Sequence, residues 1–218
     1  MARMTPEDRW QAIVDAALSV ALRKGLGATT VRDVAAEMGT SSGLIHHYFS
    51  SMDEVLAEAF EQAAGRDLSS TIEAMATFDD PGERLAAFFR SYVRSDQDWA
   101  FQLWLDAWAE AARRPALRRS SVRLNIAWQQ LLVETIRAGV IAGEMICNDP
   151  EAAAWRIVSL LDGLSLQVVA HRATLDRPTV TAWVVETAES ELGMDAGSLA
   201  DLVQSSTKVT SARPRRER

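Results

Sequence analysis

The stretch TVRDVAAEMGTSSGLIHHYF, residues 30–49, decides the fold of this chain. Thr30 and Asp33 have the spacing of a reciprocal cap at the start of a helix, and Gly39 favours a turn that ends it. Ser41 can cap the helix that follows. We therefore predict two short helices joined by a brief turn, the first of about eight residues and the second ending at Phe49.

Three residues inside this stretch meet the steric needs of a helix-turn-helix. Two helices that cross closely need a small residue at the crossing, a turn that favours glycine, and an aliphatic side chain that the second helix buries. Ala35, Gly39 and Ile45 stand at these three positions. The spacing therefore indicates a helix-turn-helix.

An amphipathic helix precedes the motif. Thr5 and Pro6 supply a cap followed by proline at the first helical position. Apolar residues then recur at intervals of three and four as far as Lys24 and Gly25, so we predict a helix over residues 6–24. Because short helices bury little surface alone, the two helices of the motif must pack on this one and on the helix that starts near Ser51.

The chain beyond residue 55 keeps a helical periodicity, and no alternating strand pattern of useful length occurs in it. Further helices are expected at residues 53–76, 81–95, 97–113, 116–142, 150–171 and 178–192. We therefore predict an all-α protein of about nine helices, in which a three-helix helix-turn-helix head is joined to a larger helical domain. The small, polar and then basic residues after Ser198 predict a flexible tail.

The formal net charge of -7 is spread unevenly along the 218 residues. Residues 1–50 hold five basic and five acidic side chains, residues 51–204 hold 13 and 24, and the last 14 residues hold five and one. An acidic body would repel DNA everywhere except at a docking face on the first segment. The charge distribution permits nucleic-acid binding there without indicating it.

Composition and motif content argue against several classes of protein. Hydrophobic residues make up 48% of the chain, yet no run approaches the roughly 18 consecutive apolar residues of a membrane-spanning helix. The N-terminus lacks the apolar core of a secretory signal, and Cys147 has no second cysteine to pair with, so we expect a cytoplasmic protein without a membrane partner. No glycine-rich phosphate loop, histidine pair at metal spacing or nucleophile elbow occurs, so we expect no enzyme activity, metal or cofactor.

Residues 8–60 resemble the DNA-binding head of the TetR family of transcriptional regulators. The resemblance rests on Gly27 before the paired threonines, on the alanine–glycine spacing, and on His47-Tyr48-Phe49 followed by Ser51 and the start of a helix. It implies that the helix at residues 41–49 lies in the DNA major groove as a recognition helix. The family commonly has lysine where this chain has Met52, so we expect a shallower salt dependence of DNA binding.

The exposed face of the predicted recognition helix supplies the candidate DNA contacts. The residues expected to reach base edges are Ser42, Gly43, Leu44 and His46. The residues expected to contact phosphates are Thr30, Ser41, His47 and Tyr48. Thr30 and Ser41 have a second interpretation, in which they only cap helices and do not touch DNA.

Tryptophans and carboxylates are concentrated in the middle of the chain. Indole faces attract cations and carboxylates neutralise them, which suggests a binding site for a cationic amine such as a quaternary ammonium or a polyamine. The alternative is that tryptophans at helical spacing fill a core. The candidate effector-binding residues are Trp99, Gln102, Trp104, Asp106, Trp108, Trp128 and Trp155.

The region from Trp104 to Leu166 resembles the C-terminal domain of BetI-like regulators, a subgroup of the TetR family whose name-giving member responds to choline. The matching features are Trp104 with Pro115, the segment AGVIAGE at residues 138–144, Asp149-Pro150, and DGLSLQ at residues 162–167. The resemblance implies a small-molecule effector, and many relatives that share this region bind other ligands or ligands that are unknown.

The helix expected at residues 150–171 is apolar nearly all round, so it must be buried on more than one side. Paired with the next helix and with their symmetry mates, it would form the four-helix interface of a homodimer, as the family resemblance also implies. A monomer could instead hide this helix internally. The candidate interface residues are Trp155, Val158, Leu161, Leu164, Val168, Trp183 and Val184.

These observations predict a ligand-responsive transcriptional regulator, most simply a repressor, that binds a palindromic operator in double-stranded DNA as a dimer. Residues 1–52 would bind DNA, residues 53–195 would bind the effector and dimerise, and residues 196–218 would form the flexible basic tail. The alternative is a helical adaptor protein that does not bind DNA.

Overall fold

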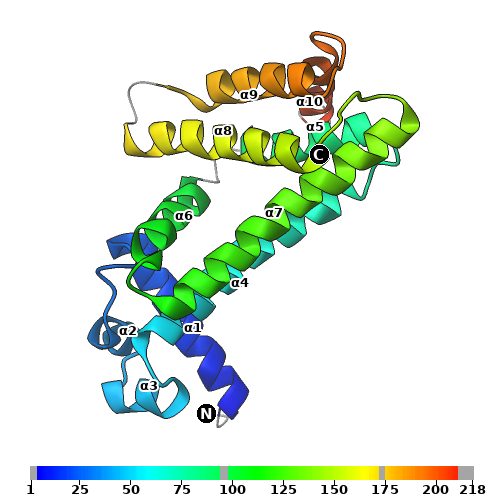
Figure 1. The fold of residues 1–218 in the computed structure, drawn as a ribbon. Coiled ribbons are helices and arrows are strands. Elements are labelled where there is room, and N and C mark those ends of the chain that lie inside the picture. The colour runs from blue at the N-terminus through cyan, green and yellow to red at the C-terminus, as the bar shows by residue number, and fades with distance from the viewer. Residues whose placement is uncertain (1–3, 94–97, 172–174, 211–218) are drawn as a thin grey trace, which may run out of the picture. The chain divides into compact units, whose positions relative to one another are not determined.

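The computed structural model describes residues 4–93, 98–171 and 175–210, which form ten α-helices and no strand (Figure 1). The helices are α1 (Pro6–Lys24), α2 (Val31–Glu37), α3 (Ser42–Tyr48), α4 (Met52–Met75), α5 (Pro81–Val93), α6 (Asp98–Ala111), α7 (Pro115–Ala142), α8 (Pro150–Ala170), α9 (Arg177–Glu191) and α10 (Ser198–Thr210). The predicted all-α class is confirmed, and the helix predicted over residues 6–24 coincides with α1. The predicted bounds of α4 to α9 lie within two residues of those observed. The exceptions are the predicted end of α5 at residue 95 and the predicted start of α6 at residue 97, which lie outside the described residues.

The prediction of a flexible segment after Ser198 is wrong for residues 198–210, which form α10. The carboxylate of Glu189 in α9 accepts hydrogen bonds from the backbone N–H groups of Gly197, Leu199 and Ala200 at 2.8, 2.9 and 3.0 Å. Leu199 is also fully buried. A capping carboxylate from another helix and a buried apolar contact therefore fix the start of α10. Residues 211–218 of the predicted tail lie outside the described residues.

The chain forms two compact units. The first combines residues 1–68 with residues 98–126, so it holds α1 to α3, the first part of α4, α6 and the first part of α7. The second combines residues 69–97 with residues 127–218, where α8 packs on α9 and where α10 packs on α5 and α9. The boundary expected at residue 52 falls inside the first unit.

Apolar side chains from the first four helices form the core that supports the helix-turn-helix. Its buried members include Ile13, Val14, Ala17, Val34, Ala35, Ile45, Phe49 and Val55. Trp10 packs against this core, and its ring stacks on that of Phe49 with centroids 5.7 Å apart. The short helices α2 and α3 are therefore held by burial against α1 and α4, as expected for helices too short to be stable alone.

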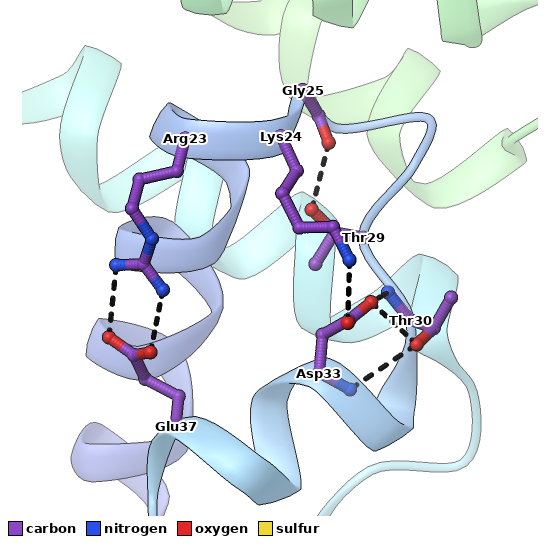
Figure 2. A network of polar contacts seen from close by, with 7 residues as sticks. All are labelled: Arg23, Lys24, Gly25, Thr29, Thr30, Asp33 and Glu37. Atoms are coloured by element: carbon purple, nitrogen blue, oxygen red, sulfur yellow. Dashed lines mark hydrogen bonds and ion pairs between the residues drawn. The ribbon is translucent and has the colours of Figure 1, made fainter.

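Polar contacts lock α1 to α2 on the surface of the first unit (Figure 2). Arg23 and Lys24 at the end of α1 form ion pairs with Glu37 and Asp33 of α2, each at 2.6 Å. Hydrogen bonds from Lys24, which has the larger effect, and from Thr30 lower the pKa of the Asp33 carboxyl to about 2. Exposed ion pairs stabilise a fold only slightly. Asp33 also caps the start of α2, so its ion pair with Lys24 links that end of α2 to the end of α1.

Within the described ranges, α8 is the one helix whose length and hydropathy would allow it to cross a membrane. The chain buries 33% of its apolar window, and the buried residues of α8 include Ala154, Ile157 and Leu161. The apolar character of α8 is therefore explained in part by packing within the second unit, and among the described residues Leu164 and Val168 are only half-buried and Trp155 is exposed.

Candidate nucleic-acid interface

Helices α2 and α3 form the predicted helix-turn-helix. Ala35 is 4% exposed and Ile45 is 1% exposed, as required at the crossing of the two helices. Gly39 lies between them with a φ of +62°, a conformation that favours glycine because it has no Cβ. The N–H of Thr40 donates to the carbonyl of Ala35 at 2.9 Å and closes the turn. The steric roles predicted for these residues are confirmed.

Helix α3 presents one open face. Ile45 and Phe49 are buried, as predicted from their spacing, which leaves Gly43, His46 and His47 exposed. The half-buried residues of this segment are Ser42, Leu44 and Tyr48. The open face thus carries a bare stretch of backbone and two imidazole rings, which are groups that can approach base edges and phosphates.

The predicted caps of α2 and α3 have different outcomes. Thr30 forms a reciprocal cap, since its Oγ1 accepts from the Asp33 N–H at 3.3 Å and its own N–H donates to Asp33 Oδ2 at 3.0 Å. Ser41 occupies the cap position of α3, but its side chain makes no capping hydrogen bond, so the predicted cap is wrong. The exposed Ser41 hydroxyl and the first amide groups of α3 therefore keep their capacity to bind an anion.

The start of α4 completes the surface next to α3. Ser51 Oγ accepts from the Glu54 N–H at 3.2 Å, and Glu54 Oε2 accepts from the N–H of Ser50 at 2.9 Å rather than from that of Ser51. Met52 is half-buried and packs against the core of the head. Met52 therefore contributes apolar contact to the head and no positive charge at the start of α4.

Five of the candidate effector residues lie in the first unit. Trp104 is buried, with its ring 4.9 Å from that of Phe60 and 5.6 Å from that of Trp108, which is 36% exposed. Asp106 Oδ2 accepts from the backbone N–H of Leu26 at 3.1 Å, and its Oδ1 accepts from the Gln102 side chain at 3.2 Å. The fifth residue, Trp99, is half-buried. Asp106 thus ties α6 to the turn between α1 and α2.

The other two candidate effector residues lie in the second unit. Trp128 is buried and packs against Phe88 and Tyr92, with ring centroids 5.9 and 5.7 Å apart. Trp155 is 39% exposed. Core packing, the alternative weighed above for the tryptophans, accounts for the environment of Trp128 and of Trp104. Trp108 and Trp155 keep exposed indole surface.

The candidate dimer residues divide by their exposure. Val158, Leu161 and Val184 are at most 2% exposed in the single chain, so their side chains have almost no surface left for a partner. Leu164 and Val168 are half-buried, and Trp155 and Trp183 are 39% and 46% exposed.

Among the described residues, no group of three histidine, cysteine, aspartate or glutamate side chains could hold a metal ion.

Two features were not predicted from the sequence, a long-range contact of Asp106 and the raised pKa of Asp162. The contact between Asp106 and the Leu26 amide joins residues 80 positions apart, and no local pattern signals it. Asp162 in α8 is the second case, because burial raises the pKa of its carboxyl to about 7. An aspartate within a nearly continuous apolar helix was the signal that could have found it.

An open second helix on a buried helix-turn-helix is the construction of DNA-binding transcriptional regulators. Residues 13–59 match the family model of bacterial regulatory proteins of the tetR family, and residues 81–193 match that of the BetI-type transcriptional repressor C-terminal region. The chain belongs to the TetR family, with a C-terminal region of the BetI type.

Relatives and solved structures agree with this membership. The HTH-type transcriptional regulator BetI of Rhizobium meliloti (strain 1021) is 30% identical over 73% of this chain and 77% of its own length. BetI of Agrobacterium fabrum is 30% identical over 84% and 88%. A solved structure described as a transcriptional regulator from Saccharomonospora viridis in complex with choline is 25% identical, with a TM-score of 0.77 over 86% of this chain and 98% of that one. FadR from Bacillus subtilis, in complex with stearoyl-CoA, is 21% identical with a TM-score of 0.70 over 84% and 99%, and shows the shared fold.

Proposed function

We propose that this protein is a repressor that binds a palindromic operator as a homodimer and is released by a small effector. The observation that carries the proposal is the construction of α3. Its buried Ile45 and Phe49 fix the helix on the head, and Gly43, His46 and His47 are exposed on its other face. A helical adaptor protein would also have an exposed face, but it would keep its activity when Gly43 or Tyr48 is replaced by alanine.

The base-reading residues in this proposal are Ser42, Gly43, Leu44 and His46, and the phosphate-binding residues are Thr30, Ser41, His47 and Tyr48. Of the phosphate group, Ser41 has the better support, because its hydroxyl is exposed and free of a capping bond. Thr30 Oγ1 already donates to Asp33 Oδ2 at 2.7 Å, so this hydroxyl could accept but not readily donate elsewhere. The backbone N–H of Thr30 also donates to Asp33 Oδ2, at 3.0 Å, so Thr30 would have to exchange one of these bonds to bind a phosphate.

The homodimer would form through the uncovered apolar surface of α8 and α9. Trp155 and Trp183 would contribute most, because both are large and more than a third exposed, and Leu164 and Val168 would add their uncovered parts. Burial of aromatic and aliphatic surface drives stable association. A two-fold axis through this interface would present two recognition helices to the half-sites of a palindrome. A bacterial repressor of this kind would act in the cytoplasm.

The effector in this proposal is a cationic amine. Trp108 has indole surface available for a cation, and the regulator from Saccharomonospora viridis supports a ligand of this kind because its structure contains choline. Helices α4 and α7 each run through both compact units, so a shift of α4 on effector binding could spread the recognition helices. Linkage then requires that operator and effector weaken each other's binding by the same factor.

The test of DNA binding is selection of operator fragments from random double-stranded DNA by the purified protein. We expect a palindromic site, and we expect His46→Ala to weaken binding to it by roughly 5- to 150-fold, which corresponds to about 1–3 kcal/mol. His171→Ala is the matched control, because His171 is an exposed histidine of the second unit. Failure to enrich any sequence, or equal effects of the two substitutions, would favour the adaptor protein.

A further inference from the structure

A groove of about 600 Å³ lies within the first unit, between α4 and the start of α7. Its lining includes three aromatic side chains, those of Trp10, Tyr48 and Phe49. The rings of Trp10 and Phe49 stack on each other and pack against the core of the head. None of the candidate effector residues lines this groove.

Charged side chains of both signs line the rest of the groove. Helix α4 contributes Glu54, Glu58 and Glu61, which follow one another at the spacing of one helix face, and α7 contributes Arg119 and Arg123. Glu61 forms an ion pair with Arg123 and accepts a hydrogen bond from Ser120 Oγ at 2.8 Å. This pair neutralises itself and needs no ligand.

The remaining charges have no ionic partner among the described residues. Glu58 accepts a hydrogen bond from the Gln62 side chain at 3.1 Å, and Glu54 accepts one from the N–H of Ser50 at 2.9 Å, but neither meets a basic side chain. Arg119 is exposed, and none of the described acidic side chains forms an ion pair with it. A single groove thus presents uncompensated negative charge beside aromatic rings and an uncompensated guanidinium.

We propose that this groove binds a small zwitterion that carries an alkylated ammonium group and a carboxylate. The ammonium group would lie against the rings of Trp10 and Tyr48 and beside Glu58, since aromatic faces and carboxylates both attract a cation. The carboxylate would bind the Arg119 guanidinium, which matches it in geometry and charge. A simple cation would leave Arg119 without a partner, and a simple anion would meet the carboxylates of α4.

This site is separate from the proposed effector site, and the inference stands whether or not the effector is a cationic amine. It has one link to DNA binding, because Tyr48 lines the groove and is also a proposed phosphate contact. A zwitterion bound here would therefore change operator affinity from within the head. Binding of the zwitterion can be measured without DNA, so it can be tested separately from its effect on operator affinity.

The experiment is calorimetric titration of the full chain with three matched probes, trimethylglycine, tetramethylammonium and acetate. We expect trimethylglycine to bind most tightly, at millimolar concentration or below. Arg119→Gln should weaken trimethylglycine roughly tenfold, the loss of one charge-assisted hydrogen bond, and leave tetramethylammonium unchanged. Glu58→Gln should weaken both cationic probes.

Arg118→Gln is the matched control, because Arg118 is an exposed arginine of the same helix turn that does not line the groove. The proposal is overturned if trimethylglycine does not saturate the protein, or if it binds equally well to the Arg119→Gln variant. Thermal unfolding of each variant checks that it is folded, and both arginines are exposed, so neither substitution should lower the midpoint.

Discussion

Replacement of Gly43 by alanine should weaken DNA binding and stabilise the protein at the same time. Gly43 lies in α3 without a positive φ, and a Cβ built on it meets only Ser41 Oγ, at 3.7 Å. Alanine in the interior of a helix is favoured over glycine by roughly 0.5–1 kcal/mol. At this chain length, that gain corresponds to a rise in the unfolding midpoint of about 1–4 °C.

The added methyl group would stand where the backbone of α3 is expected to approach the bases. Loss of one base contact costs about 1–3 kcal/mol, so operator affinity should fall roughly 5- to 150-fold. Fluorescence anisotropy with a labelled operator measures the affinity, and calorimetric unfolding measures the stability. Gly65→Ala is the matched control, because Gly65 is also helical and nothing lies within 4 Å of its added Cβ.

The control should gain similar stability and bind operator as the unmodified protein does. If Gly43→Ala binds operator with unchanged affinity, α3 does not approach DNA at this residue and the assignment of the recognition face is incorrect. If Gly43→Ala lowers the unfolding midpoint instead, the surroundings of α3 in solution differ from those described, and the comparison with Gly65→Ala locates the difference in the head.

Three further predictions concern single side chains. Met52→Lys should steepen the log–log dependence of operator affinity on salt concentration by about one unit, because it adds one phosphate contact, and an unchanged slope in anisotropy titrations would contradict this. Glu189→Ala should lower the free energy of unfolding by about 2–3 kcal/mol and expose the amides of α10 to hydrogen exchange, since three N–H groups lose a charged acceptor. Burial raises the pKa of Asp162 to about 7 in the folded protein, from the ordinary value of 3.8. Between these two pH values the folded state therefore keeps a proton on this carboxyl that the unfolded state has lost. Its contribution to stability therefore falls between about pH 4 and pH 7, by up to about 1.4 kcal/mol per pH unit, and parallel stability–pH curves for the native protein and Asp162→Asn would show that the carboxyl is not buried.

The sequence predicted those parts of the fold that depend on neighbouring residues. The periodicity of apolar residues and the Thr5-Pro6 start placed α1 correctly, and the Thr30–Asp33 spacing placed the cap of α2. Ala35, Gly39 and Ile45 could be assigned because the steric demands of a helix-turn-helix fall on particular positions in a short segment. Local chemistry was sufficient in each case.

The errors arose where distant residues decide the structure. Helix α10 depends on the Glu189 carboxylate and on packing against α5, and its own composition indicates a tail. The apolar pattern of α8 could not separate residues buried within the chain, such as Val158, from exposed ones such as Trp155, because a helix that is apolar all round has no polar face to orient it. The candidate DNA contacts and effector residues remain predictions for the experiments above.

The hydrogen bond from the Leu26 amide to Asp106 means that one backbone N–H reports whether α6 stays in contact with the turn after α1. This N–H lies in the turn between α1 and α2, and its acceptor is a side chain of α6. Its rate of exchange with deuterated solvent therefore depends on whether α6 rests against that turn. A compound that moves α6 would accelerate the exchange of this one amide while the helical amides of α1 keep their protection. NMR of the isotope-labelled protein could thus detect a movement of α6, through the exchange rate of the Leu26 amide, without any DNA in the sample.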